Sequence, residues 1–151
     1  MIRTALVPLV LSVAVLCIAP PSADAGRRID AAKKAKQLLQ ELAKAKGDKA
    51  DRLEQEIAGL AADLMYMDDV EPVLIGSLEA RSQAQRKAAA RLLRYTVSGA
   101  AVAPLAKALS NDRSEDVRME AATSLCLLKG GAAAGSLRNA RTSDKSKRVR
   151  A

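Results

Sequence analysis

The sequence lacks histidine, phenylalanine and tryptophan, and its only aromatic residues are Tyr66 and Tyr95. Without histidine, the chain lacks the side chain that most often serves as a general base near neutral pH. The runs of valine, isoleucine, threonine and aromatic residues that are typical of strands are missing after residue 20. Alanine, leucine, lysine, arginine and glutamate dominate instead. These features predict an all-α protein and give little support to catalysis.

The N-terminus has the pattern of a secretory signal peptide. Arg3 supplies a positive charge, Ala5 to Ala19 form an apolar run, and Ala23-Asp24-Ala25 offers the small residues that a signal peptidase recognises. We expect residues 1–25 to be this signal, and the mature chain to be exported to the periplasm or secreted. A retained membrane anchor is the alternative, although the run of about 15 residues is shorter than the roughly 20 that span a bilayer.

Cleavage of this signal would leave Cys126 as the remaining cysteine, so the mature chain would have no internal disulfide. Leu125 precedes Cys126 and Leu127-Leu128 follow it, which favours a small buried apolar role. A catalytic thiol usually requires a histidine base, and the sequence has none.

Motifs for cofactors and metals are also missing. The cysteines lie in no zinc-site spacing, and Gly130-Gly131 lacks the Gly-Lys-Ser/Thr continuation of a phosphate loop. The acidic pairs Asp68-Asp69 and Glu115-Asp116 stand at predicted helix starts, where carboxylates stabilise the helix dipole. We therefore expect no catalytic residue, no metal and no cofactor.

Charge is divided unevenly along the chain, whose net charge is +8. Residues 53–80 hold seven acidic and no basic residues, whereas residues 81–151 hold fifteen basic and five acidic ones. A domain this basic attracts acidic proteins, anionic polymers or anionic lipid. The acidic stretch is also able to neutralise part of the basic surface from within the molecule.

Residues 26–69 have the pattern of a helical hairpin of the coiled-coil type. Its first arm repeats apolar residues at helical spacing, namely Ile29, Ala32, Ala35, Leu39 and Leu42. Lys46-Gly47-Asp48 marks the break, because glycine ends helices and aspartate caps them. Its second arm has an a/d heptad seam made of Leu53, Ile57, Leu60, Leu64 and Met67. We expect antiparallel packing of the arms and docking of the hairpin on the helices that follow.

The rest of the chain repeats at an offset of 32 residues. This offset aligns Pro72 with Pro104, Arg86 with Arg118 and Arg150, Ala89-Ala90 with Ala121-Ala122, Leu93 with Leu125, Gly99 with Gly131, Asp112 with Asp144 and Val117 with Val149. The units cover about 70–100, 101–131 and 132–151, the last incomplete. In each unit we expect a first helix (about 70–79, 102–110 and 132–140) and a second helix (about 82–96, 115–129 and from 147).

The middle unit carries the fullest pattern. It has Ala103-Pro104-Leu105 in the first helix, Asp112 in the turn, Asp116-Val117-Arg118 and Ala121-Ala122 in the second helix, and Gly130 at the end. This pattern resembles HEAT repeats of the short type found in phycobilisome lyases, over about residues 70–151. The first unit departs from it, since Ala80 stands where aspartate is expected and Gln85 where valine is expected.

The resemblance implies an all-α fold in which the helical hairpin is followed by a short HEAT-like, armadillo-like α-solenoid. It also implies that the chain binds other proteins. The expected signal peptide argues against lyase activity, because those enzymes work on the cytoplasmic side. Helix pairs this short bury their apolar faces only by stacking on their neighbours.

Within the stack, we expect the turn aspartates to accept hydrogen bonds from the second helix of each unit. The repeated arginines can reach the turn of a neighbouring unit, so we expect Arg86, Arg118 and Arg150 to be structural. The third unit stops inside a helix, which leaves three alternatives. The last half-unit frays, another chain covers it, or the sequence is the N-terminal part of a longer array.

HEAT arrays present their second helices on a concave surface, which is expected to be basic here. We expect this surface to bind another protein, either acidic or extended. The candidate contacts are Lys87, Arg91, Arg94 and Tyr95 on the first unit and Arg113 in the second turn. The alternative is an anionic envelope polymer or membrane surface, bound by the tail residues Lys145, Lys147, Arg148 and Arg150. Nucleic acid is not expected, because the chain has no aromatic stacking platform, and neither is a small molecule.

Overall fold

The computed structural model describes residues 21–62, 67–96, 98–128 and 131–151, and every regular element in these ranges is a helix. The α-helices are α1 (Pro21–Leu42), α2 (Asp48–Ala62), α3 (Met67–Ser77), α4 (Gln83–Leu92), α5 (Val102–Asn111), α6 (Glu115–Leu127), α7 (Ala134–Ser143) and α8 (Lys147–Arg150). Short 3-10 helices lie at Leu93–Tyr95, Gly99–Ala101 and Gly131–Ala133. The expected all-α class is confirmed.

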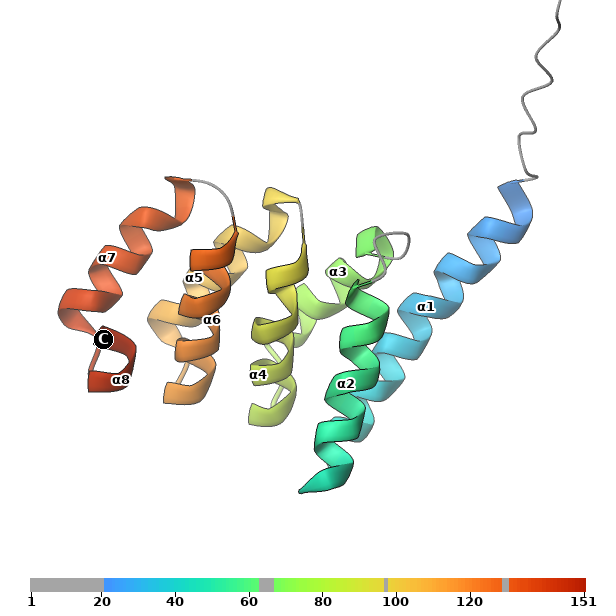
Figure 1. Ribbon diagram of the computed structural model, residues 1–151, viewed down its shortest axis with the longest axis horizontal. Coiled ribbons are helices and arrows are strands. Elements are labelled where there is room, and N and C mark those ends of the chain that lie inside the picture. The colour runs from blue at the N-terminus through green and yellow to red at the C-terminus, as the bar shows by residue number, and fades with distance from the viewer. Residues whose placement is uncertain (1–20, 63–66, 97, 129–130) are drawn as a thin grey trace, which may run out of the picture.

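The first two helices form an antiparallel hairpin (Figure 1). Gly47 allows the turn between them because its φ of 58° lies in the left-handed region that favours glycine. Leu39 and Leu42 of α1 and Leu53 and Ile57 of α2 are buried in the same apolar cluster, and the two helices pack on each other. Of the predicted heptad seam, Leu53, Ile57 and Leu60 lie on α2, whereas Met67 belongs to α3. Leu64, another member of that seam, lies outside the described residues.

The helices stack in two layers (Figure 1). We call α1, α3, α5 and α7 the A layer, and α2, α4, α6 and α8 the B layer. In the B layer α4 packs closely on α6, and α6 on α8, while α1 packs on α3 in the A layer. A groove of about 570 Å³ separates α3 from α5. Between the first and second units, α4 and α6 of the B layer are therefore closer together than α3 and α5 of the A layer. The B layer thus lies on the inner side of the stack at this junction.

One apolar core runs through the stack. Its fully buried members include Leu39, Leu42, Ile57, Leu74, Leu93, Leu105, Leu109 and Leu125. Ala89 and Ala121 are completely buried, and such small side chains allow α4 and α6 to approach closely. The buried Ser124 hydroxyl donates to the carbonyl of Ala90 at 2.6 Å, which joins α6 to α4. In contrast, α7 and α8 contain no fully buried residue.

A buried carboxylate fixes the segment that leaves α4. Glu71 of α3 is only 6% exposed, and it accepts hydrogen bonds from the hydroxyls of Thr96 and Ser98, each at 2.6 Å. These bonds give hydrogen-bond partners to buried oxygens that would otherwise destabilise the core. The second helix of the first unit also ends earlier than expected. The α-helix stops at Leu92 and a 3-10 turn replaces the last turn of the predicted 82–96 helix.

The described part of the predicted signal is helical. Ala23-Asp24-Ala25 lies within α1, which the structure describes from Pro21. The apolar run at 5–19 lies outside the described residues, so the signal stays a prediction. Within the described ranges, no helix is both long and apolar enough to cross a bilayer.

Candidate protein-binding surface and the ladder that builds it

An aspartate lies in the turn just before each of the last two B-layer helices. Asp112 Oδ1 accepts a hydrogen bond from the backbone N–H of Ser114 at 2.8 Å, and Asp144 Oδ1 accepts one from Ser146 at 2.7 Å. These bonds satisfy amides that the starts of α6 and α8 leave without helical partners. The turn aspartates thus accept backbone hydrogen bonds as expected, but from the N-cap residues Ser114 and Ser146 and not from residues within the helices, and Ser114 itself makes no side-chain cap.

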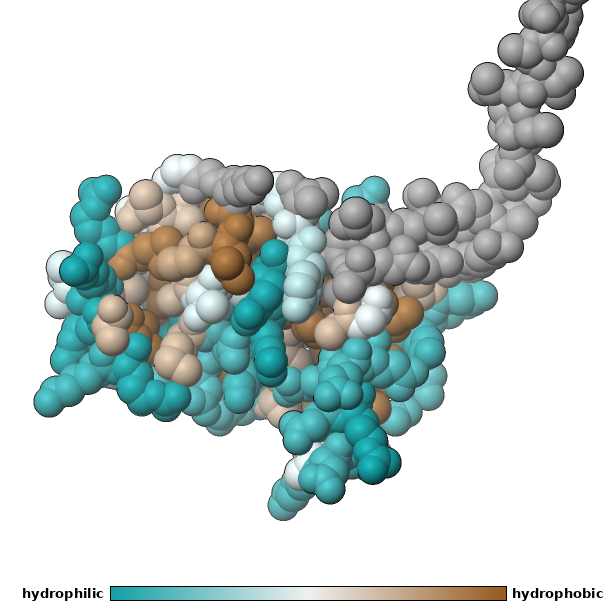
Figure 2. All heavy atoms as spheres, viewed as in Figure 1, coloured by the Kyte–Doolittle hydropathy of each residue, from teal (hydrophilic) through white to brown (hydrophobic). Residues whose placement is uncertain are grey.

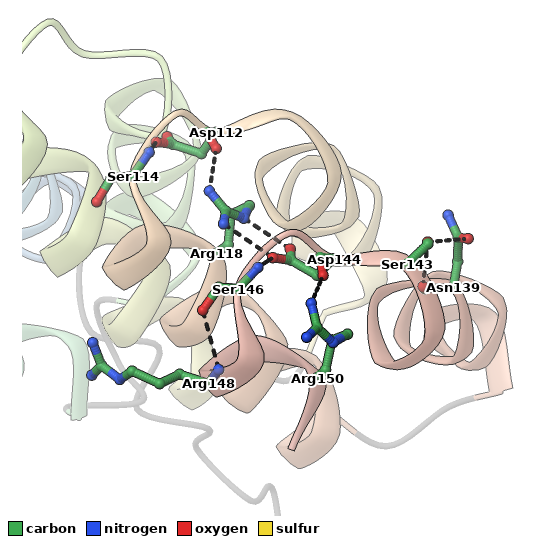
Figure 3. Close-up of polar contacts among 9 residues, drawn as sticks. All are labelled: Asp112, Ser114, Arg118, Asn139, Ser143, Asp144, Ser146, Arg148 and Arg150. Atoms are coloured by element: carbon green, nitrogen blue, oxygen red, sulfur yellow. Dashed lines mark hydrogen bonds and ion pairs between the residues drawn. The ribbon is translucent and has the colours of Figure 1, made fainter.

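The same two aspartates receive arginines from the preceding unit. Arg86 Nε and Nη2 donate to the two carboxylate oxygens of Asp112 at 2.7 and 3.1 Å. Arg118 repeats the arrangement on Asp144, at 2.8 and 3.0 Å (Figure 3). The four side chains are 3–7% exposed. Such paired, parallel hydrogen bonds are strong and geometrically specific, so the predicted structural role of Arg86 and Arg118 is confirmed.

These contacts stabilise the charged forms of both partners. Hydrogen bonds from Arg118, together with the N–H of Ser146 and the arginine charge, outweigh burial and lower the pKa of Asp144. The same bond to Asp144 raises the pKa of Arg118. Burial is the largest influence on Asp112 and raises its pKa, but the hydrogen bonds from Arg86 and Ser114, together with the charges of Arg86 and Arg113, outweigh it and leave the pKa lowered.

The remaining edge of each arginine binds the turn of its own unit. Arg86 Nη1 donates to the carbonyls of Ala80 and Arg81, each at 3.0 Å, and Arg118 Nη1 donates to the carbonyl of Asp112 at 2.9 Å. Arg150 Nη1 donates in the same way to the carbonyl of Asp144 (Figure 3). Each arginine therefore has one edge for its own turn and one for the next unit. We call this series the arginine–aspartate ladder.

Ion pairs also connect neighbouring helices on the surface of the B layer. Arg91 of α4 lies 3.0 Å from Glu54 of α2, and Arg94 lies 2.9 Å from Glu120 of α6. Arg148 of α8 lies 3.1 Å from Glu115 and 3.4 Å from Asp116 of α6.

The expected basic surface is thus a surface of mixed charge. Part of the neutralisation comes from the acidic stretch, as proposed, through Glu54. The sequence could not predict the rest, because Glu120 meets Arg94 only when α6 stacks on α4.

Tyr95 is a large side chain that is exposed on the surface of the B layer. It is 46% exposed, at the end of the 3-10 turn that follows α4. It borders a groove of about 300 Å³ between α2 and α4. The other residues that line the groove are Asp51, Glu54, Gln55, Ala58, Arg91 and Leu92. We call this the α2/α4 groove.

The structure brings together some of the predicted contact residues and separates others. Arg91 and Tyr95 share the α2/α4 groove. Lys87 is half-buried and makes no side-chain hydrogen bond or ion pair with the described residues. Arg113 lies apart, in the turn before α6, where it donates to the carbonyl of Arg81 at 3.2 Å. That any of these residues binds a partner stays a prediction.

The sequence reasoning missed the residues that α2 contributes to the groove. Asp51, Gln55 and Ala58 recur at helical spacing on one face of α2, so a signal was present. The sequence alone did not show which face of the hairpin packs on α4. The prediction for Cys126 was wrong, since its side chain is exposed on α6.

Viewed from the B layer, the surface is largely hydrophilic over α2 and α4, and hydrophobic residues gather towards α6 and α7 (Figure 2). Leu127, at the end of α6, is 58% exposed. Among the described residues, no three cysteine or acidic side chains lie together as metal ligands would.

Two layers of paired helices, stacked at a fixed offset and joined by buried arginine–aspartate pairs, define an α-solenoid. Within that class, a family model for HEAT repeats matches residues 70–151, which is more than half of the chain. The chain belongs to the HEAT-repeat family. The match does not distinguish the phycobilisome-lyase type of repeat from other HEAT repeats. No curated protein and no solved structure matches the chain significantly.

Proposed function

We propose that the chain is an exported, non-catalytic scaffold that binds an acidic or extended segment of another protein. The segment lies along the B layer, and Tyr95 is its anchor. The observation that carries this proposal is the half-exposed tyrosine beside the α2/α4 groove. Tyrosine offers a large contact area together with a polar hydroxyl, and it is enriched among the residues that dominate binding energy.

Family membership supports the general role, since HEAT repeats commonly mediate protein–protein interaction. The lining of the groove supports an extended partner. Asp51, Glu54 and Arg91 place both charge signs around the tyrosine, so a segment with alternating charges or amide groups finds partners there. Lys87, which has no ion-pair partner among the described residues, adds one cation for an acidic side chain.

The paired charges weigh against the alternative of a purely electrostatic surface. Arg91, Arg94 and Arg148 each already face a carboxylate of the chain. An anionic polymer or lipid surface would have to compete with these carboxylates, which weakens its attraction to the B layer. A protein segment that packs on Tyr95 does not require these pairs to break.

A pull-down from native envelope extract tests the proposal, with the chain from Gly26 as bait at low and at high salt. We expect one dominant protein that remains bound at high salt, because packed contacts are screened less than surface charges. Tyr95→Ala is expected to weaken binding by about 1–2 kcal/mol, which is about five- to thirtyfold in Kd. Leu127→Ala, which truncates an exposed side chain outside the groove, is the matched control. Retention of only diffuse acidic material, lost as salt rises, contradicts the proposal and favours the polymer or lipid surface.

A further inference from the structure

The groove between α3 and α5, which we call the α3/α5 groove, is an open junction within the A layer. α1 packs on α3, and α5 packs on α7, whereas α3 and α5 do not pack closely although they are neighbours in the same layer (Figure 1). A space of about 570 Å³ remains between them. The hairpin precedes α3 and the third unit follows α5, so this groove is internal to the stack.

The walls of the α3/α5 groove are aliphatic. Its apolar lining residues are Ile75, Leu78, Ala103, Pro104 and Ala108. From Ala103 to Asn111 the lining follows α5 over about 12 Å, at about 1.5 Å per residue. A groove of this size, with mostly apolar walls and a few polar groups, has the usual form of a small-molecule site.

This aliphatic lining is particular to the junction between the first and second units. At the 32-residue offset, Ile75 and Leu78 correspond to Lys107 and Ser110 on the α7 side of the second unit. The junction that is closed therefore has polar residues where the open junction has apolar ones. The sequence did not predict a small-molecule site, because Ile75 and Leu78 meet the second unit only when the units stack.

The groove ends at two arginines that have no carboxylate partner among the described residues. Glu79, Asn111 and Asp112 line both the α3/α5 groove and an adjoining depression of about 550 Å³, which also contains Arg81 and Arg113. Both arginines are exposed. The Arg81 side chain makes no hydrogen bond or ion pair with the described residues, and that of Arg113 donates only to the carbonyl of Arg81.

The carboxylates at this end of the groove are already paired. Asp112 receives Arg86 at 2.7 and 3.1 Å, and Glu79 lies 2.7 Å from Lys107. The charges that remain are the two guanidinium groups of Arg81 and Arg113. An apolar groove with a cationic end is complementary to a molecule that has an aliphatic chain and one anionic head.

We propose that the α3/α5 groove binds an aliphatic carboxylate of the fatty-acid class, with its chain along Ile75 and Pro104 and its head at Arg81 and Arg113. Guanidinium groups bind carboxylates through paired hydrogen bonds. The aliphatic walls favour a hydrocarbon chain over a protein segment, because they offer no hydrogen bond to peptide groups and a hydrocarbon chain needs none. The groove lies in the A layer, so this inference stands or falls independently of the binding proposed at Tyr95.

Methyl NMR on the full chain tests this proposal. The δ1 methyl groups of isoleucine are labelled with ¹³C, and dodecanoate is added below the concentration at which it forms micelles. Ile75 reports on the groove, the buried Ile57 reports on the fold, and Ile2 and Ile18 report on association with the apolar run at the N-terminus. We expect a saturable shift at Ile75 while Ile57 stays in place. Shifts confined to Ile2 and Ile18 overturn the proposal.

Changes to the ligand separate the roles of chain and head. Octanoate should bind at least about tenfold more weakly than dodecanoate, because fewer CH₂ groups leave water. Dodecyltrimethylammonium has the same chain with a cationic head, and it should also bind at least about tenfold more weakly. Equal binding of the two heads overturns the proposal. A peptide of aliphatic and acidic residues that moves Ile75 where dodecanoate does not also overturns it, and makes the groove a protein site.

A substitution that fills the groove tests where the chain binds. Gly76 of α3 lines the groove, and nothing lies within 4 Å of an added Cβ. Gly76→Leu should therefore fold, as the Ile57 resonance will show, and should weaken binding of dodecanoate at least about tenfold. Gly59→Leu adds the same side chain to α2 at an equally unobstructed position and should stay within about twofold.

Removal of charge tests where the head binds. Arg81→Gln together with Arg113→Gln should weaken binding about five- to tenfold. Arg138→Gln together with Arg141→Gln removes the same charge from exposed positions of α7 and should stay within about twofold. The proposal requires both losses, so binding that is insensitive either to Gly76→Leu or to the Arg81 and Arg113 substitutions overturns it.

Discussion

At the scale of single residues, the ladder arginines and aspartates each perform two tasks. Asp112 and Asp144 each accept the N–H of the serine that precedes the next helix and also receive an arginine, while Arg86 and Arg118 bind carbonyls of their own turn and the aspartate of the next unit. Arginine serves here better than lysine, because its planar group donates along two edges at once.

Removal of one ladder arginine should destabilise the stack strongly. Arg118→Ala leaves the buried carboxylate of Asp144 without its partner, which costs about 3–5 kcal/mol for pairs of this kind. Urea denaturation followed by circular dichroism measures the loss. Arg113→Ala, which removes an exposed arginine with a single hydrogen bond to a carbonyl, should change stability by less than about 1 kcal/mol. Equal effects of the two substitutions would show that the buried pair does not hold the units together.

Stability should fall in acid because of the ladder aspartates. The pKa of Asp144 is lower in the folded chain than in the unfolded chain, mainly because Arg118 donates to it. Its stabilising effect is therefore complete above the unfolded pKa, near pH 4, and is lost as the pH falls through the folded pKa. In denaturation curves between pH 2 and 7, Asp144→Asn should lower stability at neutral pH and converge with the parent chain in acid. Glu79→Gln, at an exposed pair with Lys107, is the control and should alter the profile little.

At the scale of the helices, most elements could be predicted from periodicity and from the turn residues. The predicted first helix of the middle unit, 102–110, corresponds to α5 at Val102–Asn111. The departures lie where spacing carries less information. The heptad spacing of Leu53, Ile57 and Leu60 continues to Met67 in the sequence, yet Met67 belongs to α3, because spacing alone does not assign a residue to one helix or the next.

The hairpin turn offers a test at this scale. Gly47 has a φ of 58° and nothing within 4 Å of the position of an added Cβ, so only the backbone opposes a side chain there. Gly47→Ala should destabilise the chain by about 1 kcal/mol, since non-glycine residues are disfavoured in this conformation. Gly59→Ala, within α2 and equally unobstructed, should instead stabilise it by about 0.5–1 kcal/mol. Thermal melts of both variants measure the difference, and the same sign for both would contradict the assigned turn geometry.

At the scale of the whole molecule, stability is distributed along the stack and decreases towards the third unit. Solenoids of this kind are stabilised by contacts between neighbouring units. The second unit is covered on both sides, whereas α7 and α8 contain no fully buried residue. The surface charges could not be predicted for a related reason. Pairs such as Arg94–Glu120 depend on how one unit sits on the next, and a single sequence does not give that rotation.

Hydrogen exchange should reveal this gradient. We expect the amides of α7 and α8 to exchange faster than those of α4 and α6, because local opening requires less free energy where fewer contacts are lost. Arg118→Ala should widen the difference by releasing the third unit while α3 and α4 remain protected. Uniform exchange through all units in both chains would indicate a single cooperative block rather than a stack of coupled units.

The central claim is that the B layer binds a protein at Tyr95, and site-specific photocrosslinking in the source cells tests it most directly. One variant carries a photoreactive side chain at position 95, and the other carries it at the exposed Ala103 of the A layer. The account predicts a single crosslinked protein from position 95 that persists when lysis and washing use high salt, and little from position 103. Crosslinks only from position 103, or crosslinks from position 95 that vanish with salt, would contradict it.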